Sequence, residues 1–327
     1  MKLLKRVCFI VALLIASSSI VFFALPIKRK SAQKKDEPKV ITVWQIDMFE
    51  GGKGARKDSV SRLAKAYEKT QKSLYTSVIE QTVEGAEQKL ASGIKPDLIS
   101  FSAGLDGVEG LAKKLPMSDG FAGSVNGDTF AVAWAYGGYF LISKTESYNE
   151  LFISSGLGYN SPCSAAYLSG IDIENAIILP PEEAFASFAK SENGALIGTQ
   201  RDLVRAERKN SKPVIKPLGE YTDLVQYMAI TSDEENFEAS LSFLKYFLSE
   251  SEKETEKLNL LSPYKKQKTS DNQVIARLLE LKPTKTLYAF ASKEVIASLD
   301  ETFKNSKNKT ENELKIAKCT FKSLKIN

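Results

Sequence analysis

Residues 40–101 alternate between the pattern of a buried strand and that of an amphipathic helix, and this order limits the folds open to the chain. The first strand, Val40–Trp44, is rich in β-branched residues and is bounded by polar sequence. Apolar residues then recur at i, i+3, i+4 and i+7, the spacing of one helical face: Val60, Leu63, Ala64 and Tyr67. A second strand (73–80), a second helix ending at Gly93 and a third strand (96–101) follow. This β-α-β-α-β order predicts a parallel sheet covered by helices.

Paired glycines interrupt the next extended segment. In residues 130–136 (FAVAWAY) bulky and small apolar residues alternate, and YFLIS resumes the extended pattern after Gly137 and Gly138. Glycines in such a position predict a bend or a hinge. Two later strands are predicted at 195–198 (ALIG) and 222–231 (TDLVQYMAIT), and a long amphipathic helix follows the second of them.

Two helix starts carry the capping-box pattern, in which Ser or Thr precedes Glu by three residues. Ser232 with Glu235 precedes the long amphipathic segment, and Thr310 with Glu313 precedes the last helix. We expect each hydroxyl to accept a hydrogen bond from a backbone N–H of the first helical turn. The inward face of the last helix is expected to extend as far as Leu324.

The positive charge of the chain is concentrated at its N-terminus. The net charge is +5, but residues 1–39 hold nine Lys or Arg and only two acidic residues. The rest of the chain is therefore nearly neutral. A folded part without a basic excess argues against nucleic acid as a partner.

Few residue types suited to catalysis are present. The chain has no histidine, which excludes Ser-His-Asp and Cys-His catalysis and most zinc or iron sites. Pairs of carboxylates can act as general acid and base. Asp202 and Asp223 are of this type, but nothing in the sequence orients them as a pair. We therefore expect no enzyme, no cofactor and no metal site. Cys163 and Cys319 belong to the folded part, and the sequence leaves open whether they pair or remain two buried thiols.

An apolar N-terminal segment predicts export. Residues 7–25 are uncharged, follow three basic residues and nearly suffice to cross a bilayer. We interpret residues 1–26 as a signal peptide or an N-terminal membrane anchor, and residues 27–39 as a basic tether. A weak small-x-small site at Ala16 and Ser18 leaves cleavage open, and no lipobox cysteine closes the apolar run. The basic flank after this segment would place the folded part in the cytoplasm under the positive-inside rule.

The glycine-rich loop after the first strand has the composition, but not the spacing, of a phosphate-binding loop. Asp47 stands where a P-loop requires its first glycine, and Gly54 stands where it requires a hydroxyl. The loop nevertheless follows the carboxyl end of a strand, where open α/β sheets bind ligands. Ser102 and Ala103 follow the third strand in the same way.

Six segments in a consistent order resemble the extracellular solute-binding proteins of ABC importers, in the group that includes sugar-binding members. They cover roughly residues 40–265 and read ITVWQIDMFEGGKGARKD, PDLISFSAG, FAVAWAYGGYFLISK, GALIGTQRDLVRAE, PLGEYTDLVQYMAIT and LNLLSP. The resemblance implies an α/β, two-lobed, periplasmic-binding-protein-like fold of type II, whose lobes close around a ligand by hinge motion. The implied hinge crosses at Gly137–Gly138, at 221–229 and near 261–263.

The same resemblance implies how the chain divides. Residues 40–136 and 230–260 would form lobe one, and residues 137–229 and 261–327 would form a reduced lobe two. The chain departs from the group in its short segment 146–184 and its lack of a lipobox. Many sugar-binding relatives also place an aromatic residue after the strand that is ALIG here, where this chain has Gln200 and Arg201.

The candidate ligand-binding residues are aromatic and polar side chains near the implied cleft. They are Trp44, Phe49, Glu50, Ser102, Trp134, Tyr136, Gln200, Arg201, Tyr221 and Asp223, with Gly137 and Gly138 as the hinge. Aromatic rings suit the apolar face of a sugar, although Trp134 belongs to a bulky stripe that favours the core. A residue such as Glu50 is more often a solvated loop charge than a ligand contact.

Arg201 opens a predicted helix, which is an unfavourable place for a cation. This position suggests a specific role, such as holding a carboxylate, a phosphate or hydroxyl groups with its planar fork. The alternative is an ion pair with Asp202 or Glu220. Asp223 would accept hydrogen bonds from ligand hydroxyls or pair with Arg201.

We therefore expect a non-enzymatic, extracytoplasmic solute-binding receptor. It would capture a small polar ligand, with a carbohydrate as the expected class, and deliver it to the permease subunits of an ABC importer. The resemblance is to exported proteins, and for this reason we set aside the cytoplasmic placement that the positive-inside rule would give. The expected location is the periplasm or the outer face of the cytoplasmic membrane, with residues 7–25 as the candidate anchor. The alternative is a membrane-anchored sensor or interaction protein that keeps the fold without transport, which the reduced second lobe favours.

Overall fold

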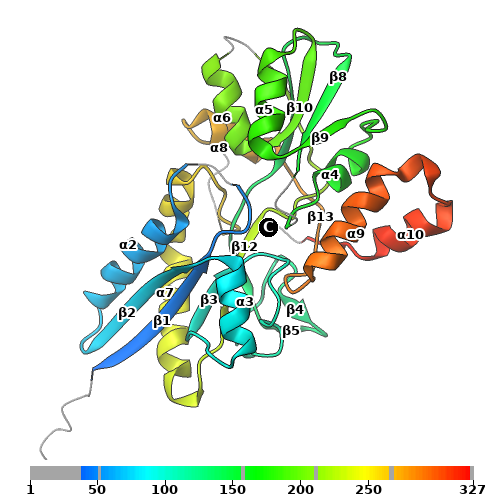
Figure 1. The fold of residues 1–327 in the computed structure, drawn as a ribbon. Coiled ribbons are helices and arrows are strands. Elements are labelled where there is room, and N and C mark those ends of the chain that lie inside the picture. Colours follow the sequence, from blue (N-terminus) through cyan, green and yellow to red (C-terminus); the bar gives the residue numbers. More distant parts are fainter. Residues whose placement is uncertain (1–37, 51–52, 156–158, 210–212, 265–268, 325–327) are drawn as a thin grey trace, which may run out of the picture. The chain divides into compact units, whose positions relative to one another are not determined.

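Two five-stranded sheets, each with helices of its own, organise the chain from Lys39 onward (Figure 1). The computed structural model describes residues 38–50, 53–155, 159–209, 213–264 and 269–324. The expected signal peptide or anchor, and the tether up to residue 37, lie outside the described residues.

The first sheet contains the strands of the predicted β-α-β-α-β unit and two strands from later in the chain. Its strands are β1 (Lys39–Ile46), β2 (Leu74–Gln81), β3 (Leu98–Phe101), β6 (Val132–Tyr136) and β12 (Val225–Ile230). They lie in the order β2-β1-β3-β12-β6. As the sequence predicts, β1 is parallel to both β2 and β3. β12 is antiparallel to its neighbours β3 and β6.

Side chains of β1 point alternately to the two faces of this sheet. Both faces carry apolar residues, and helices cover both of them. The helices are α2 (Arg56–Glu68), α3 (Val83–Ala91) and α7 (Glu234–Lys257). Ile41 and Val43 belong to the same buried cluster as apolar residues of α2 and α7. Trp44 and Ile46 belong to the cluster that contains the buried residues of α3.

The second sheet starts directly after the glycine pair. Its strands are β7 (Tyr139–Ser143), β8 (Glu150–Ser154), β9 (Ile177–Leu179), β10 (Gly194–Thr199) and β11 (Val214–Pro217). They lie in the order β11-β7-β10-β8-β9. β8, β9 and β10 are parallel, so their carboxyl ends share one edge of the sheet. β7 is antiparallel to β10 and β11.

Six helices accompany the second sheet in the described residues. They are α4 (Pro162–Leu168), α5 (Pro181–Lys190), α6 (Gln200–Lys209), α8 (Gln273–Glu280), α9 (Lys293–Lys304) and α10 (Glu311–Cys319). α5 packs on β8 and β10, α6 packs on α8, and α4 packs on α9. Short elements complete the chain: β4 (Ser124–Val125), β5 (Asp128–Thr129), β13 (Lys285–Thr286), η1 (Ser306–Asn308) and β14 (Lys322–Ser323).

The three predicted crossing segments lie side by side and share backbone hydrogen bonds. Tyr136 and Leu261 exchange two N–H···O bonds of 2.8 Å, and the Gly137 N–H donates to the Leu224 carbonyl at 2.8 Å. The expected boundary after residue 229 needs correction, because residues 225–229 belong to β12 and fill the first sheet between β3 and β6.

Part of the C-terminal segment also contacts the first lobe. The Ala289 N–H donates to the Ala122 carbonyl, and the Gly104 N–H donates to the Ala291 carbonyl. Residues near 290 are therefore in contact with loops of the first lobe, although residues 261–327 were expected to belong to the second.

Three local expectations at helix ends have different outcomes. Thr310 and Glu313 form the predicted capping box at the start of α10. The box predicted at Ser232 does not form, because α7 begins at Glu234 with Asp233 as its N-cap. α10 ends at Cys319, so Leu324 follows the helix rather than extending its inward face.

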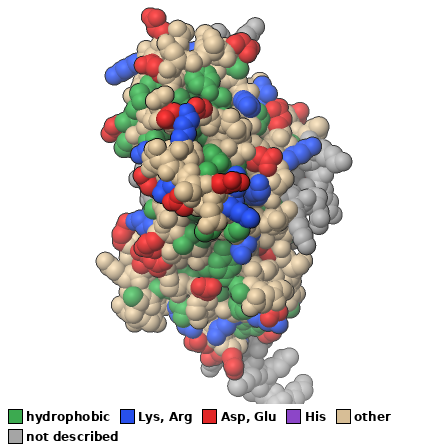
Figure 2. All heavy atoms as spheres, turned by 90° about the vertical axis from the view of Figure 1, so that its right-hand side faces the viewer, with side chains coloured by type: hydrophobic (Ala, Val, Ile, Leu, Met, Phe, Trp, Pro, Cys, Tyr) green, Lys and Arg blue, Asp and Glu red, His purple; other side chains and the backbone are tan. Residues whose placement is uncertain are grey.

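The described part of the chain contains no helix that is both long enough and apolar enough to cross a bilayer. The two cysteines of the folded part are free thiols, with Cys163 buried and Cys319 exposed. On the face shown in Figure 2, acidic and basic side chains are interspersed rather than gathered by sign.

Candidate functional site

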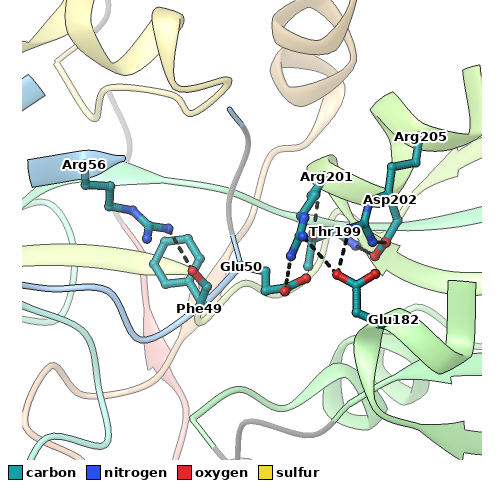
Figure 3. A network of polar contacts seen from close by, with 8 residues as sticks. All are labelled: Phe49, Glu50, Arg56, Glu182, Thr199, Arg201, Asp202 and Arg205. Atoms are coloured by element: carbon teal, nitrogen blue, oxygen red, sulfur yellow. Dashed lines mark hydrogen bonds and ion pairs between the residues drawn. The ribbon is translucent and has the colours of Figure 1, made fainter. Parts of the chain in front are cut away.

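Two of the predicted site residues, Glu50 and Arg201, meet across the two lobes (Figure 3). Glu50 follows the carboxyl end of β1 in the first lobe, and Arg201 lies in the first turn of α6, directly after the carboxyl end of β10 in the second. Their side chains form an ion pair. The Arg201 guanidinium also donates to Glu182 Oε1 at 3.0 Å, and Glu182 lies in the first turn of α5. Arg201 therefore holds carboxylates from both lobes.

A second guanidinium extends this arrangement within the second lobe. Arg205 donates to Glu182 Oε1 at 2.8 Å and lies 3.6 Å from Asp202 Oδ1. Asp202 is fully buried, and its Oδ2 accepts a hydrogen bond from the Thr199 N–H at 3.1 Å. We call Glu50, Glu182, Arg201, Asp202 and Arg205 the charged network.

Electrostatics differ sharply between the carboxylates of the charged network. Burial raises the pKa of Asp202 to about 6, and the nearby Glu50 carboxylate acts in the same direction, while Arg205 opposes it. The exposed Glu182 behaves oppositely: its pKa is lowered, mainly by the hydrogen bond from Arg205. The buried end of the network therefore holds negative charge less readily than the exposed end.

Asp223 and Tyr221 lie in a separate buried cluster of the second lobe. Asp223 accepts hydrogen bonds from the Tyr139 hydroxyl at 2.6 Å and from the Ser161 N–H and Oγ at 2.6 and 2.7 Å. The Tyr221 hydroxyl lies 2.7 Å from Ser161 Oγ. Burial nevertheless raises the pKa of Asp223. The ion pairs of Arg201 in the described residues are with Glu50 and Glu182, so the alternatives of Asp223, Asp202 and Glu220 as its partner are not found.

The two tryptophans pack inside the first lobe. Trp44 is 4% exposed and belongs to the apolar cluster around α3, with Lys89 Nζ 5.4 Å from its ring centre. Trp134 is fully buried, donates its indole N–H to Ser100 Oγ at 3.0 Å and meets the Phe247 ring edge-on. For Trp134, this is the core position that its place in a bulky stripe favours.

Phe49 and Tyr136 are also buried. The Arg56 guanidinium lies 4.1 Å from the Phe49 ring centre and donates to the Phe49 carbonyl at 3.0 Å. The Tyr136 ring packs against Phe121 with centres 5.2 Å apart, and burial raises the pKa of Tyr136 to about 12. Phe49 precedes Glu50 directly, and Tyr136 precedes the glycine pair, so both buried side chains anchor the segments on which Glu50 and the glycines lie.

Gln200 and the glycine pair form one unit where the chain passes from the first sheet to the second. The Gln200 Oε1 accepts a hydrogen bond from the Gly138 N–H at 3.1 Å. A Cβ added to Gly137 would lie 2.5 Å from Gln200 Nε2, and one added to Gly138 would lie 2.0 Å from Leu281 Cδ1. The glycines are thus required by close approach of side chains, not by positive φ. Ser102, which follows β3 in the first lobe, is buried. Its hydroxyl donates a hydrogen bond to Gln226 Oε1 at 3.3 Å.

Sequence reasoning missed Glu182 and Arg205 as members of the charged network, and it also missed the close approach of Tyr159 to the loop after β3. A Cβ added to Gly104 in the loop after β3 would lie 3.1 Å from Tyr159 Cδ1, and Lys293 Nζ lies 4.8 Å from the Tyr159 ring centre.

An acidic residue in the first turn of a helix is common because it interacts favourably with the helix dipole. For this reason Glu182 gives no signal that its partner would be Arg201.

No protein-family model and no curated protein sequence matches the chain. Among solved structures, the galacto-N-biose-/lacto-N-biose I-binding protein of an ABC transporter from Bifidobacterium longum superposes with a TM-score of 0.58 at 13% identity, covering 86% of this chain and 95% of that one. The GacH receptor of Streptomyces glaucescens gives a TM-score of 0.53 at 15% identity, covering 86% and 97%. Iron-bound HitA from Pseudomonas aeruginosa gives 0.55 at 13% identity, covering 81% and 99%.

These likenesses, together with the two sheets and the bonded crossing segments, confirm the expected fold class. Each solved chain is covered almost completely, so the resemblance includes both sheets. The chain has the two-lobed α/β fold of the solute-binding proteins of ABC transporters.

Proposed function

We propose that this protein is an extracytoplasmic receptor that binds a small polar ligand between its two lobes and delivers it to the permease subunits of an ABC importer. The observation that carries this proposal is the pairing of Glu50 with Arg201 across the lobes, because each residue follows the carboxyl end of a strand in its own sheet. Those strand ends are where open α/β sheets bind ligands.

The expected mechanism is a shift between arrangements of the two lobes. A ligand that contacts both lobes favours the closed arrangement only by the difference between its affinities for the closed and open forms. The crossing segments at Tyr136–Gly138, Leu224 and Leu261 are the hinge of this proposal, since they are bonded to one another and link the two sheets. Glu50 is the proposed ligand contact on the first lobe, and its ion pair with Arg201 marks where the second lobe faces it.

A carbohydrate is the proposed ligand class. Several of the similar structures are complexes with sugars or sugar analogues, among them lacto-N-biose and acarbose. The apolar segment at residues 7–25 supports export, and membrane attachment through it is part of the proposal. No nucleic acid, cofactor or catalytic step is proposed.

Ligand-dependent stabilisation of the full chain tests the proposal. The panel contains maltose, lacto-N-biose, N-acetylglucosamine, glucosamine, spermidine and a set of amino acids, each measured by thermal shift and by isothermal titration. A true ligand at about 100 times its Kd stabilises the folded state by about 2.7 kcal/mol and raises Tm in a saturable way. A flat response to the whole panel contradicts the receptor function.

A further inference from the structure

The charged network contains more carboxylates than guanidiniums. Arg201 and Arg205 face Glu50, Glu182 and Asp202. Each guanidinium contacts two carboxylates, and Glu182 is shared between them. An additional positive charge would balance the network, whereas an additional negative charge would unbalance it further.

Glu50 and Arg201 differ in the charged partners that each would keep if the ion pair between them were broken. Without Glu50, Arg201 would still hold Glu182, which comes from its own lobe. Among the residues that the structure describes, Glu50 forms its ion pair with Arg201, so without Arg201 the Glu50 carboxylate would face the other lobe unpaired. The side chains of Glu50 and Arg201 are only 24% and 32% exposed, so solvent replaces a lost partner incompletely.

Asp202 provides a second observation on the negative charge of this network, because one of its carboxylate oxygens has no donor. Its side chain is fully buried, and its Oδ1 accepts no hydrogen bond from the described residues, with Arg205 NH1 at 3.6 Å as its nearest cation. Burial, assisted by the charge of Glu50, raises its pKa to about 6. The environment thus penalises the negative charge that the network already holds.

Three kinds of ligand can be compared at this position. A neutral ligand inserted between the lobes would separate Glu50 from Arg201 and give neither a new charged partner. An anionic ligand would satisfy Arg201 but leave Glu50 unpaired beside a further negative charge. A cationic ligand would pair with Glu50 while Arg201 keeps Glu182, so that no charge is left without a partner.

We propose that the ligand of this receptor carries a protonated amine, which binds the Glu50 carboxylate in the place that Arg201 occupies in the structure. The amine donates its N–H hydrogen bonds, and the carboxylate accepts them. Arg201 is an internal substitute for the ligand's cation and turns to Glu182 when the ligand binds. This inference rests on the proposed receptor function and narrows its ligand class to amine-bearing small polar molecules, amino sugars included.

The test compares three probes with one ring: glucosamine, which carries the amine, and glucose and N-acetylglucosamine, which carry no charge. Spermidine is the acyclic cation. With the full chain at pH 7, we expect a saturable response to at least one amine probe, and at least tenfold weaker binding of both uncharged sugars. Glu50→Gln should weaken amine binding at least tenfold, whereas Arg201→Gln, which removes the competing internal cation, should strengthen it severalfold.

A matched control removes a carboxylate elsewhere. Glu174→Gln takes away an exposed carboxylate of the second lobe that pairs with Lys307, and amine binding should stay within twofold of the unsubstituted chain. An equal loss in Glu174→Gln and Glu50→Gln would reveal nonspecific attraction and overturn the inference. Loss of binding in Arg201→Gln would also overturn it, because the guanidinium would then be a ligand contact.

The outcomes separate this inference from the receptor function. If N-acetylglucosamine or another uncharged sugar of the panel binds and the amines do not, the receptor function stands and the amine inference fails. If no member of the panel binds, both fail. Binding of spermidine without glucosamine supports the amine and excludes an amino sugar of this ring type.

Discussion

The carboxylate of Glu50, after the first strand of one lobe, pairs with the guanidinium of Arg201, which lies in the first turn of α6 in the other lobe. Both side chains keep some contact with solvent, so we expect a double-mutant cycle to give the pair only about 0.2–1 kcal/mol of unfolding free energy. Its larger effect is on the lobes, because they cannot separate at this point without breaking the contact.

We therefore predict that Arg201→Gln increases the separation of the lobes in the ligand-free protein. High salt should have the same effect on the unsubstituted chain, since the Debye length falls from about 10 Å at 0.1 M to about 3 Å at 1 M ionic strength. The matched control is Arg277→Gln, which removes an exposed cation that pairs with Glu280 within α8. It should leave the separation unchanged.

The separation is measured by pulsed electron spin resonance between spin labels on the two lobes. Glu84→Cys in α3 and Lys190→Cys in α5 place one label on each, and both positions are exposed. Cys8 and Cys319 are replaced by serine, while Cys163 is buried and stays. An identical distance distribution for the unsubstituted chain and Arg201→Gln, at both salt concentrations, would show that the ion pair does not hold the lobes.

Gly137 is predicted to be intolerant of any side chain. In Gly137→Ala the new Cβ would lie 2.5 Å from Gln200 Nε2, which forces a shift of the hinge or of the amide. We expect destabilisation by about 1–3 kcal/mol, as is typical of overpacking, measured by urea unfolding.

Two further variants identify the cause of this loss. Gly110→Ala is the matched control, because an added Cβ there meets nothing within 4 Å and the backbone is not left-handed; its stability should change little. Combining Gly137→Ala with Gln200→Ala should recover part of the loss by removing the clash. Additive losses in the double variant would mean that Gln200 is not the reason for the glycine.

Local patterns in the sequence predicted local structure well. The strand–helix alternation of residues 40–101 gave the correct parallel order, because period-2 and period-3.6 patterns report directly which faces are buried. The capping box at Thr310 also formed as predicted, since its two hydrogen bonds lie within one helical turn. The structure also places the predicted hinge glycines and crossing segments together.

Features that depend on tertiary contacts were harder to predict. The box at Ser232 failed because the N–H groups of Thr231 and Ser232 both bond the Asp97 carbonyl, which holds the segment against the first sheet and delays the helix. The alternative considered for Arg201 was an ion pair with Asp202 or Glu220, but its partners are Glu50 and Glu182, which only the arrangement of two sheets brings near. The sequence does not encode such pairings locally.

Tyr139→Phe should destabilise the second lobe. The Tyr139 hydroxyl donates to the buried Asp223 carboxylate at 2.6 Å, and its removal leaves a buried acceptor without one of its donors. We expect a loss of about 1–3 kcal/mol in urea unfolding. Tyr148→Phe is the matched control, because the Tyr148 hydroxyl makes no hydrogen bond to any residue that the structure describes and the ring is only partly buried. Equal stability of the two variants would mean that the Asp223 contact contributes nothing.

Asp300 should make stability decrease as pH rises. Burial raises its pKa to about 7, and the nearby Asp223 carboxylate adds to the shift. The pKa of an aspartate in the unfolded chain is about 3.9, so the folded state binds the Asp300 proton more tightly than the unfolded state does. The contribution of Asp300 to the free energy of unfolding is therefore favourable at low pH and is lost between about pH 4 and pH 7. Asp300 keeps some contact with solvent, so we expect a loss of about 2 kcal/mol in the free energy of unfolding rather than the full shift at about 1.4 kcal/mol per pKa unit.

The variant Asp300→Asn tests this prediction. Its side chain can still accept the Cys163 N–H bond that Asp300 accepts at 2.8 Å. The free energy of unfolding should depend less on pH in this variant, which should gain stability relative to the unsubstituted chain from pH 5 to pH 8. Urea unfolding at four pH values measures the difference, and parallel curves for the two proteins would refute a raised pKa at this position.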